Sequence, residues 1–190
     1  MKNFAVLASG KGSNLQAILS AVKEKKIKAN LNVVVSDNRD AFALKRAIKE
    51  KIATVVVDPK SFKSRKDMDK AIVKELKSFG VDFVVLAGYM RILSPYFVKA
   101  YKNKILNIHP ALLPSFKGAH AIRDAFRYGV RITGVTVHLV DEKVDHGFVI
   151  AQESVQIRDK ETFKSLEARI HKVEHKLYPE VISRFAKGCF

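Results

Sequence analysis

The chain has 190 residues, which is enough for one well-packed domain and too short for two of ordinary size. Its hydrophobic content of 47% is typical of a globular protein, and no stretch approaches the ~18 uninterrupted apolar residues that a membrane span needs. Lysine and arginine outnumber aspartate and glutamate by 35 to 19, for a formal net charge of +16. We therefore expect one domain, residues 1–190, with no membrane partner.

The positive charge suits anionic partners, but its distribution favours a simpler interpretation. Lysines lie along helical stretches such as AVKEKKIKAN, with acids between them, as on solvated helix faces. No aromatic-basic motif accompanies them, so we do not expect a nucleic-acid partner. The apolar opening FAVLA runs directly into glycines and a helical pattern, which indicates a first strand, not a signal peptide, and a cytoplasmic location. The one cysteine, Cys189, excludes an internal disulfide.

Apolar runs alternate with helical patterns through the first two thirds of the chain. The runs FAVLA, LNVVVS, TVVVD, FVVLAG and KILNI are followed by helical segments that begin near positions 14, 41, 66, 95 and 121. Five such units predict an α/β fold: a Rossmann-like open sheet, mainly parallel, with helices on both faces.

The pattern changes from about position 133. ITGVTVHLV and FVIAQESVQI are strand-like, and the segment DEKVDHG between them is too short for a helix. We expect a strand pair that adds at least one antiparallel strand to the sheet. Residues 160–186 predict one or two helices that cover it.

A glycine-rich turn, ASGKGSN, joins the first strand to the first helix. Free backbone N–H groups and the helix dipole converge at such a turn, which suits a phosphate. The spacing is not that of a dinucleotide fingerprint, because glycine is missing where Leu15 or its neighbours stand. A plain tight connection between strand and helix remains the alternative.

The segment LAGYMRILSP follows the fourth apolar run. Tyr89, Met90, Ile92 and Leu93 are large apolar residues in a loop, where they either line a pocket for a flat aromatic ligand, with Arg91 at its rim, or cover the core.

Asn107 and His109 end the fifth apolar run, just before Pro110. Residues i and i+2 of an extended chain project to the same side, so the amide and the imidazole should face one pocket. Because open α/β sheets bind ligands at the carboxyl ends of their strands, this pair is our candidate for catalysis.

Other polar residues are weaker candidates. His171 and His175 are four apart, as in some metal sites, but without an adjacent acid or third ligand we reject zinc. Asp141 and Glu142 are ordinary turn residues. Asp145, directly before the last strand-like run, could approach His109 across the sheet.

Together these motifs resemble one enzyme family. GKGSNLQAIL, SDNRDAFAL, LAGYMRILSP, NIHPALLPSFKGAHAI, TGVTVHLVDEKVDHG and VEHKLYP are similar, in order, to the glycinamide ribonucleotide formyltransferases, which are folate-dependent enzymes of purine synthesis. The resemblance spans residues 4 to 182. It implies a formyltransferase fold with a phosphate-binding half at residues 1–100 and a catalytic, folate-binding half at residues 101–190, within one domain.

The resemblance also assigns roles to residues. It implies that Asn107, His109 and Asp145 are catalytic: the amide and a protonated imidazole stabilise a tetrahedral intermediate, and the carboxylate favours the protonated form of the imidazole. The ribonucleotide phosphate and ribose would be held by Gly12, Ser13, Asn14 and Glu174. The folate would be contacted by Arg65, Met90, Arg91, Ile92, Leu93 and Asn107, with the 141–145 loop closing over its pterin.

By this resemblance the substrates are 5-phosphoribosylglycinamide and, as a cosubstrate, 10-formyltetrahydrofolate. No bound cofactor or metal is expected, and the protein would be a monomer or a homodimer. The chain departs from the family pattern at Lys11, within the glycine turn, and at His146, Gly147 and Phe148, where G-G-P or T-G-P is usual.

Two alternative functions stay open. A formyltetrahydrofolate hydrolase would use the same site with water as the nucleophile, but the resemblance there brings an extra N-terminal domain and a histidine in place of Pro110. A non-catalytic phosphate-binding or RNA-binding module would explain the charge and the glycine turn, but not the pair Asn107 and His109.

Overall fold

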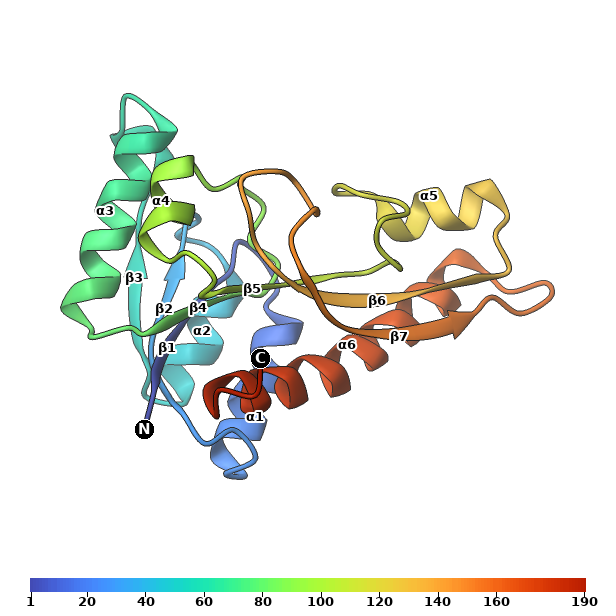
Figure 1. Ribbon diagram of the computed structural model, residues 1–190, viewed down its shortest axis with the longest axis horizontal. Coiled ribbons are helices and arrows are strands. Elements are labelled where there is room, and N and C mark those ends of the chain that lie inside the picture. Colours follow the sequence, from blue (N-terminus) through green and yellow to red (C-terminus); the bar gives the residue numbers. More distant parts are fainter.

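The computed structural model describes residues 1–190, and its seven strands form one sheet in the order β3-β2-β1-β4-β5-β6-β7 (Figure 1). The first five strands are parallel to one another: β1 (Asn3–Leu7), β2 (Asn30–Ser36), β3 (Ala53–Val56), β4 (Phe83–Leu86) and β5 (Ile105–His109). β6 (Ile132–Leu139) is antiparallel to both of its neighbours, β5 and β7 (Val149–Gln156). The predicted mainly parallel sheet and its antiparallel addition are confirmed.

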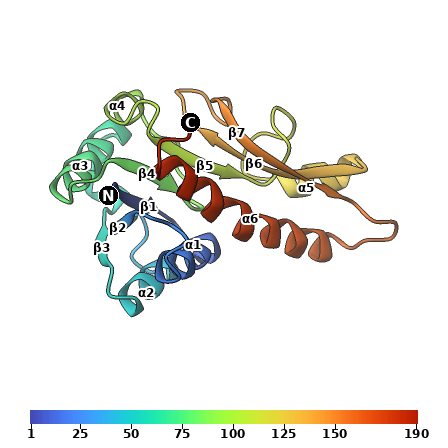
Figure 2. The same cartoon turned by 60° about the horizontal axis from the view of Figure 1, so that its bottom comes forward.

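Helices cover both faces of the sheet (Figure 2). One face carries α1 (Ser13–Lys23), α2 (Phe42–Lys49) and α6 (Phe163–Ala186), and the other carries α3 (Arg65–Ser78) and α4 (Pro95–Ala100). A short 3-10 helix (Pro59–Ser61) precedes α3, and α5 (Ala121–Tyr128) follows β5. The C-terminal region therefore forms one helix, α6, where one or two were expected. No helix combines the length and apolar character that crossing a membrane requires.

Alternating side chains divide the interior into two cores. In β1, Phe4 and Val6 belong to the core beneath α1 and α6, whereas Ala5 and Leu7 belong to the core beneath α3 and α4. This is the period-2 pattern of a strand that is buried on both faces.

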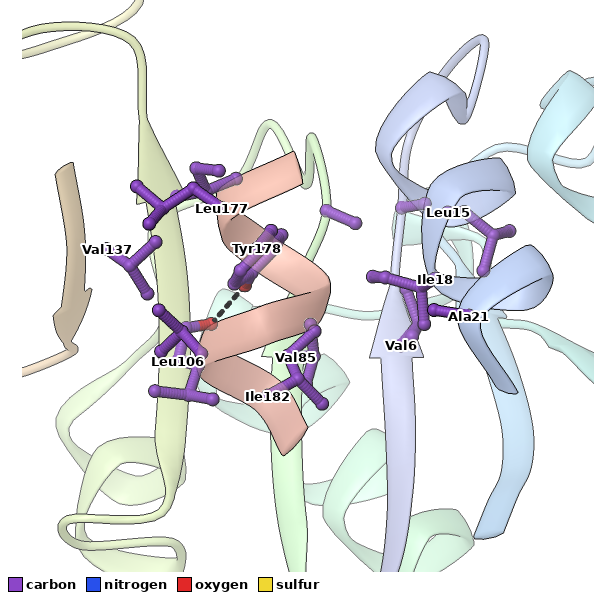
Figure 3. Close-up of a cluster of buried hydrophobic side chains, with 14 of the residues drawn as sticks. Val6, Leu15, Ile18, Ala21, Val85, Leu106, Val137, Leu177, Tyr178 and Ile182 are labelled. Carbon is purple, nitrogen blue, oxygen red and sulfur yellow. Dashed lines mark hydrogen bonds between the residues drawn. The ribbon is translucent and has the colours of Figure 1, made fainter. Parts of the chain in front are cut away.

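A buried tyrosine joins the largest core to the centre of the sheet. Tyr178 of α6 is fully buried, and its hydroxyl proton is shared between the carbonyl oxygens of Leu86, at 2.8 Å, and Leu106, at 3.0 Å. Figure 3 shows the contact with Leu106. Since Leu86 lies beside Asn107 in the ladder of β4 and β5, α6 is anchored at the level where the candidate site begins.

From β1 the chain continues to β2 and β3 toward one edge of the sheet, and it then returns to β4 on the other side of β1. The carboxyl ends of β1 and β4 therefore flank the point where the strand order reverses. The loops there are joined: the Ser9 N–H donates to the Gly88 carbonyl (3.1 Å), and the Met90 N–H donates to the Ser9 hydroxyl (2.9 Å). Open α/β sheets hold their ligands at such a point.

Candidate functional site

The glycine turn leads directly into α1, which begins at Ser13, one residue before the predicted start. Gly12 precedes the helix in the left-handed conformation, with φ of 69°, and no side chain caps the helix. The first N–H groups of a helix have no intrahelical partners, so those of the first turn are available to an anion.

Glu174 lies beside this turn, although 160 residues separate it from Asn14. The Asn14 side-chain amide donates to Oε2 of Glu174 (3.2 Å), and that oxygen is also 2.7 Å from Nδ1 of His171. Glu174 is 3% exposed, so its carboxylate is held in place by these two contacts. The hydrogen bond with Glu174 raises the pKa of His171, against the opposing effect of burial. The four residues assigned to the ribonucleotide thus gather in one place, and sequence reasoning missed His171 as their neighbour.

Asn107 and His109 project from the same face of β5. Leu106 and Ile108 belong to the core beneath α6, so the residues that alternate with them face the other way. His109 is 4% exposed although it is polar. The sequence prediction that these two side chains share a face agrees with this placement.

Asp145, in the loop between β6 and β7, faces His109 at the end of β5. Oδ2 of Asp145 lies 3.4 Å from Nδ1 of His109, and the same oxygen accepts a hydrogen bond from the Gly118 N–H (2.8 Å). Nε2 of His109 lies 2.8 Å from the Phe116 carbonyl oxygen, which can only accept, so Nε2 carries a proton. Because Nδ1 faces the Asp145 carboxylate, both ring nitrogens of His109 face acceptors.

The second histidine of the site, His138, was missed by sequence reasoning. It lies opposite Asn107 in the antiparallel ladder of β5 and β6. Its Nε2 is 3.1 Å from Nδ2 of Asn107 and 3.7 Å from Oδ1 of Asp145, and its Nδ1 is 2.9 Å from the Leu139 carbonyl. Nε2 thus faces both a donor, the Asn107 amide, and an acceptor, the Asp145 carboxylate. The alternation of side chains along β6 predicts that His138 shares a face with Thr136. Its position beside Asn107 depends on the register between β5 and β6.

Thr136 fixes the loop that follows His109. Its hydroxyl donates to the Ala111 carbonyl (2.7 Å) and accepts from the Leu113 N–H (3.0 Å). Gln152, opposite Thr136 in β7, donates to the same hydroxyl and to the Leu113 carbonyl, both at 3.0 Å. The two hydrogen bonds made directly by Thr136 to the loop are buried, and with those of Gln152 they hold the proline-containing loop against the sheet.

Asp145 is ionised at neutral pH. Burial on its own would raise the pKa of Asp145, but the neighbouring His138, the Gly118 N–H and the charge of His109 together hold that pKa below its ordinary value. Its backbone is left-handed, with φ of 46°, an uncommon conformation for a residue other than glycine. Strain of this kind is maintained where the surroundings fix a side chain for function.

The loop that carries Asp145 is closed by its own side chains. Oδ2 of Asp141 lies 2.7 Å from Nδ1 of His146, and Oδ1 accepts from the Lys143 N–H (2.9 Å). Burial opposes these contacts, which nonetheless lower the pKa of Asp141. A side chain at Gly147 would collide with the Leu139 carbonyl, so the glycine permits the close return to β7.

The residues of the predicted folate-binding loop after β4 differ in how far they are exposed. Met90 and Ile92 are exposed, whereas Leu93 is packed into the core beneath α3 and α4. Arg91 lies 3.7 Å from Asp37. Leu93 therefore covers the core, as the alternative interpretation expects, whereas Met90 and Ile92 lie at the surface, where a ligand could reach them.

Arg65, at the start of α3, lines a groove near this loop. The groove is also lined by Ser94, Lys99 and Glu142, the last from the loop that carries Asp145. Arg65 and that loop are thus neighbours, although their positions in the sequence are far apart.

His171 and His175 are stacked, with ring centroids 6.4 Å apart and planes inclined by 13°. No group of three or more histidine, cysteine, aspartate or glutamate side chains is arranged to hold a metal ion.

Comparison with known proteins shows the family to which the chain is similar. The family model described as "Formyl transferase" matches residues 2–182. The chain is 44% identical over 184 residues to the phosphoribosylglycinamide formyltransferase of Bacillus subtilis (strain 168), and the match covers 97% of this chain and 94% of that protein. It is also 44% identical over 185 residues to the trifunctional purine biosynthetic protein adenosine-3 of Gallus gallus, of which it spans 18%, the match covering 97% of this chain.

A solved structure agrees with the fold. The crystal structure of glycinamide ribonucleotide transformylase 1 from Symbiobacterium toebii superimposes with a TM-score of 0.96 at 44% identity, over 99% of this chain and 89% of that one. With a family model that matches nearly its whole length and relatives this similar, the chain belongs to the formyl transferase family.

Proposed function

We propose that the protein transfers the formyl group of 10-formyltetrahydrofolate to the amine of 5-phosphoribosylglycinamide, a step of de novo purine synthesis. The observation that carries this proposal is the cluster of Asn107, His109, His138 and Asp145, in a chain that matches a phosphoribosylglycinamide formyltransferase over nearly its whole length. No bound cofactor takes part, since the folate is a cosubstrate.

The reaction needs a donor for an oxyanion and a carrier for protons. The neutral amine attacks the formyl carbon, the carbonyl oxygen becomes negatively charged, and the bond from the formyl carbon to N10 of the folate then breaks. The amine loses one proton and N10 gains one, so protons balance overall. Asn107 supplies an uncharged N–H to the oxyanion, and a charged His109 supplies a second donor, with Asp145 stabilising the imidazolium.

The remaining residues bind the two substrates. We assign the phosphate and ribose of the ribonucleotide to Gly12, Ser13, Asn14 and Glu174, which lie together at the start of α1. The folate we assign to Asn107, to Arg65, Met90, Arg91 and Ile92, and to the 141–145 loop. Leu93, which the resemblance also assigns to the folate, packs into the core beneath α3 and α4 and would support that binding surface from below. Both substrates are anions, and a net charge of +16 would steer them to the protein.

We further propose that all of residues 1–190 form one formyltransferase domain, as a monomer or homodimer without nucleic-acid partners. A phosphorylated substrate does not cross membranes freely, so the enzyme must share a compartment with it. The compartment we propose is the cytoplasm.

The decisive experiment is a spectrophotometric assay of the purified protein with 10-formyltetrahydrofolate, with and without 5-phosphoribosylglycinamide. Loss of the formyl group only when the amine is present supports the transferase. Loss at the same rate without the amine would instead identify a hydrolase, and no loss in either mixture would contradict both enzymes. His109→Ala, checked for folding by circular dichroism, is the matched inactive control.

A further inference from the structure

The glycine turn is supported by α2, on which it packs directly. The Ala43 N–H donates to the Gly10 carbonyl (3.1 Å), and a Cβ at Gly12 would lie 2.8 Å from the Cβ of Ala43. Since no side chain caps α1, the conformation of the turn depends on contacts of this kind.

One guanidinium group connects the turn to both helices. Nε of Arg46, on α2, donates to the Lys11 carbonyl (3.0 Å), and its Nη1 donates to Oε1 of Gln16 on α1 (2.8 Å). The same guanidinium lies over the ring of Phe42, 4.8 Å from its centroid, and this contact further restrains the group. Charge-assisted hydrogen bonds made through two nitrogens of one planar group set direction as well as distance.

We propose that Arg46 is a positioning residue for the phosphate of the ribonucleotide, an inference that rests on the proposed function. By holding the Lys11 carbonyl toward the guanidinium, it keeps that oxygen turned away from the side where the N–H groups of Gly12, Ser13 and Asn14 bind the anion. If the peptide group between Lys11 and Gly12 rotated, its carbonyl oxygen would face the phosphate and repel it. Arg46 acts through the backbone of the turn.

The test compares Arg46→Met and Arg46→Lys with Lys45→Met. Lys45 is the matched control, because its ammonium also lies over Phe42, 5.9 Å from the ring centroid, and makes no hydrogen bond to the turn.

The affinity for 5-phosphoribosylglycinamide is measured by calorimetry. The formyl-transfer assay measures kcat and the KM for each substrate. Loss of a charge-assisted hydrogen bond predicts a Kd about tenfold or more higher in both Arg46 variants, since lysine keeps the charge but not the fork. KM for the folate and kcat at saturation should stay within twofold, as should every constant of Lys45→Met.

Wild-type ribonucleotide affinity in Arg46→Met would overturn the proposal, and so would an equal loss in folate KM or kcat, which would indicate general structural damage. If Arg46→Met does not fold, Arg46→Lys and Gln16→Ala carry the test, and normal affinity in both would be equally decisive against it.

Phosphorus NMR titration with ribose 5-phosphate separates this inference from the proposed function. Binding by the wild type that weakens in the Arg46 variants, without formyl transfer by any of them, would contradict the function and support the positioning role. No binding of ribose 5-phosphate by the wild type would contradict the positioning role.

Discussion

His109 and Asp145 face each other with 3.4 Å between Nδ1 and Oδ2, although one ends β5 and the other lies in the loop between β6 and β7. The other ring nitrogen of His109 donates to the Phe116 carbonyl, so both nitrogens are directed at acceptors. This arrangement fixes the orientation of the imidazole and places a carboxylate beside one of its nitrogens.

Removal of the carboxylate charge at Asp145 should disable the site without unfolding the protein. Asp145→Asn keeps the size of the side chain but loses the counter-charge, and kcat is expected to fall about a hundredfold or more. Steady-state kinetics with both substrates measure the loss. Asp159→Asn, an exposed carboxylate paired with Arg131, should behave as wild type. A folded Asp145→Asn protein with normal kcat would refute the role of the carboxylate.

The same carboxylate should contribute to the pH dependence of stability. Because its pKa is lower in the folded protein, despite burial, Asp145 stabilises the fold above its unfolded-state pKa of about 4. That contribution is lost as the pH falls through the still lower folded value. Urea unfolding between pH 5 and pH 2 should therefore show a smaller decline for Asp145→Asn than for the wild type. Identical declines would contradict the lowered pKa.

His138 should matter less than His109, because it acts on its neighbours. His138→Ala frees the Asn107 amide to rotate and removes one neighbour of Asp145, and we expect kcat to fall about tenfold. His138→Gln retains an acceptor for the amide and should recover part of that loss. A greater loss than that of His109→Ala would make His138 the principal proton carrier and would contradict this assignment.

From the sequence we could predict the face of β5 on which the site lies. The contacts within the site were harder to predict. The alternation of Leu106 and Ile108 with Asn107 and His109 follows from the period of a strand, and the structure agrees. His138 could not be predicted, because its position beside Asn107 depends on the register between β5 and β6, and a one-residue shift would turn it to the other face.

Local sequence patterns also could not predict which distant residues lie beside the glycine turn. Glu174 was assigned by resemblance alone, and its contact with Asn14 depends on how α6 crosses the sheet. His171 was considered only as a metal ligand, because a spacing of four residues suggests such a site, yet its nearest charged partner is Glu174. Tertiary packing decides these contacts.

The pair formed by His171 and Glu174 predicts a second pH effect, of opposite sign. The hydrogen bond to Glu174 outweighs burial and raises the pKa of His171, so the stabilisation is complete below the unfolded value of about 6.5 and is lost as the pH rises through the folded value. Glu174→Gln should therefore remove a decline in stability that the wild type shows between pH 6 and pH 9. Glu180→Gln, exposed on the same helix, is the control, and should retain that decline. An unchanged decline in Glu174→Gln would show that the pair does not control it.

Tyr178→Phe tests the contact by which α6 supports the sheet beneath the site. Burial raises the pKa of Tyr178 far above its ordinary value, so the hydroxyl remains a donor to Leu86 and Leu106 at any working pH. Its removal leaves two buried carbonyls with one partner fewer, at an expected cost of about 1–3 kcal/mol. For a chain of this length each kcal/mol lowers Tm by about 2–4 °C, which calorimetry resolves. Tyr128→Phe, at a side chain that is 81% exposed, should leave Tm unchanged. A Tyr178→Phe protein as stable as the wild type would mean that the ladder between β4 and β5 holds the strands without help from α6.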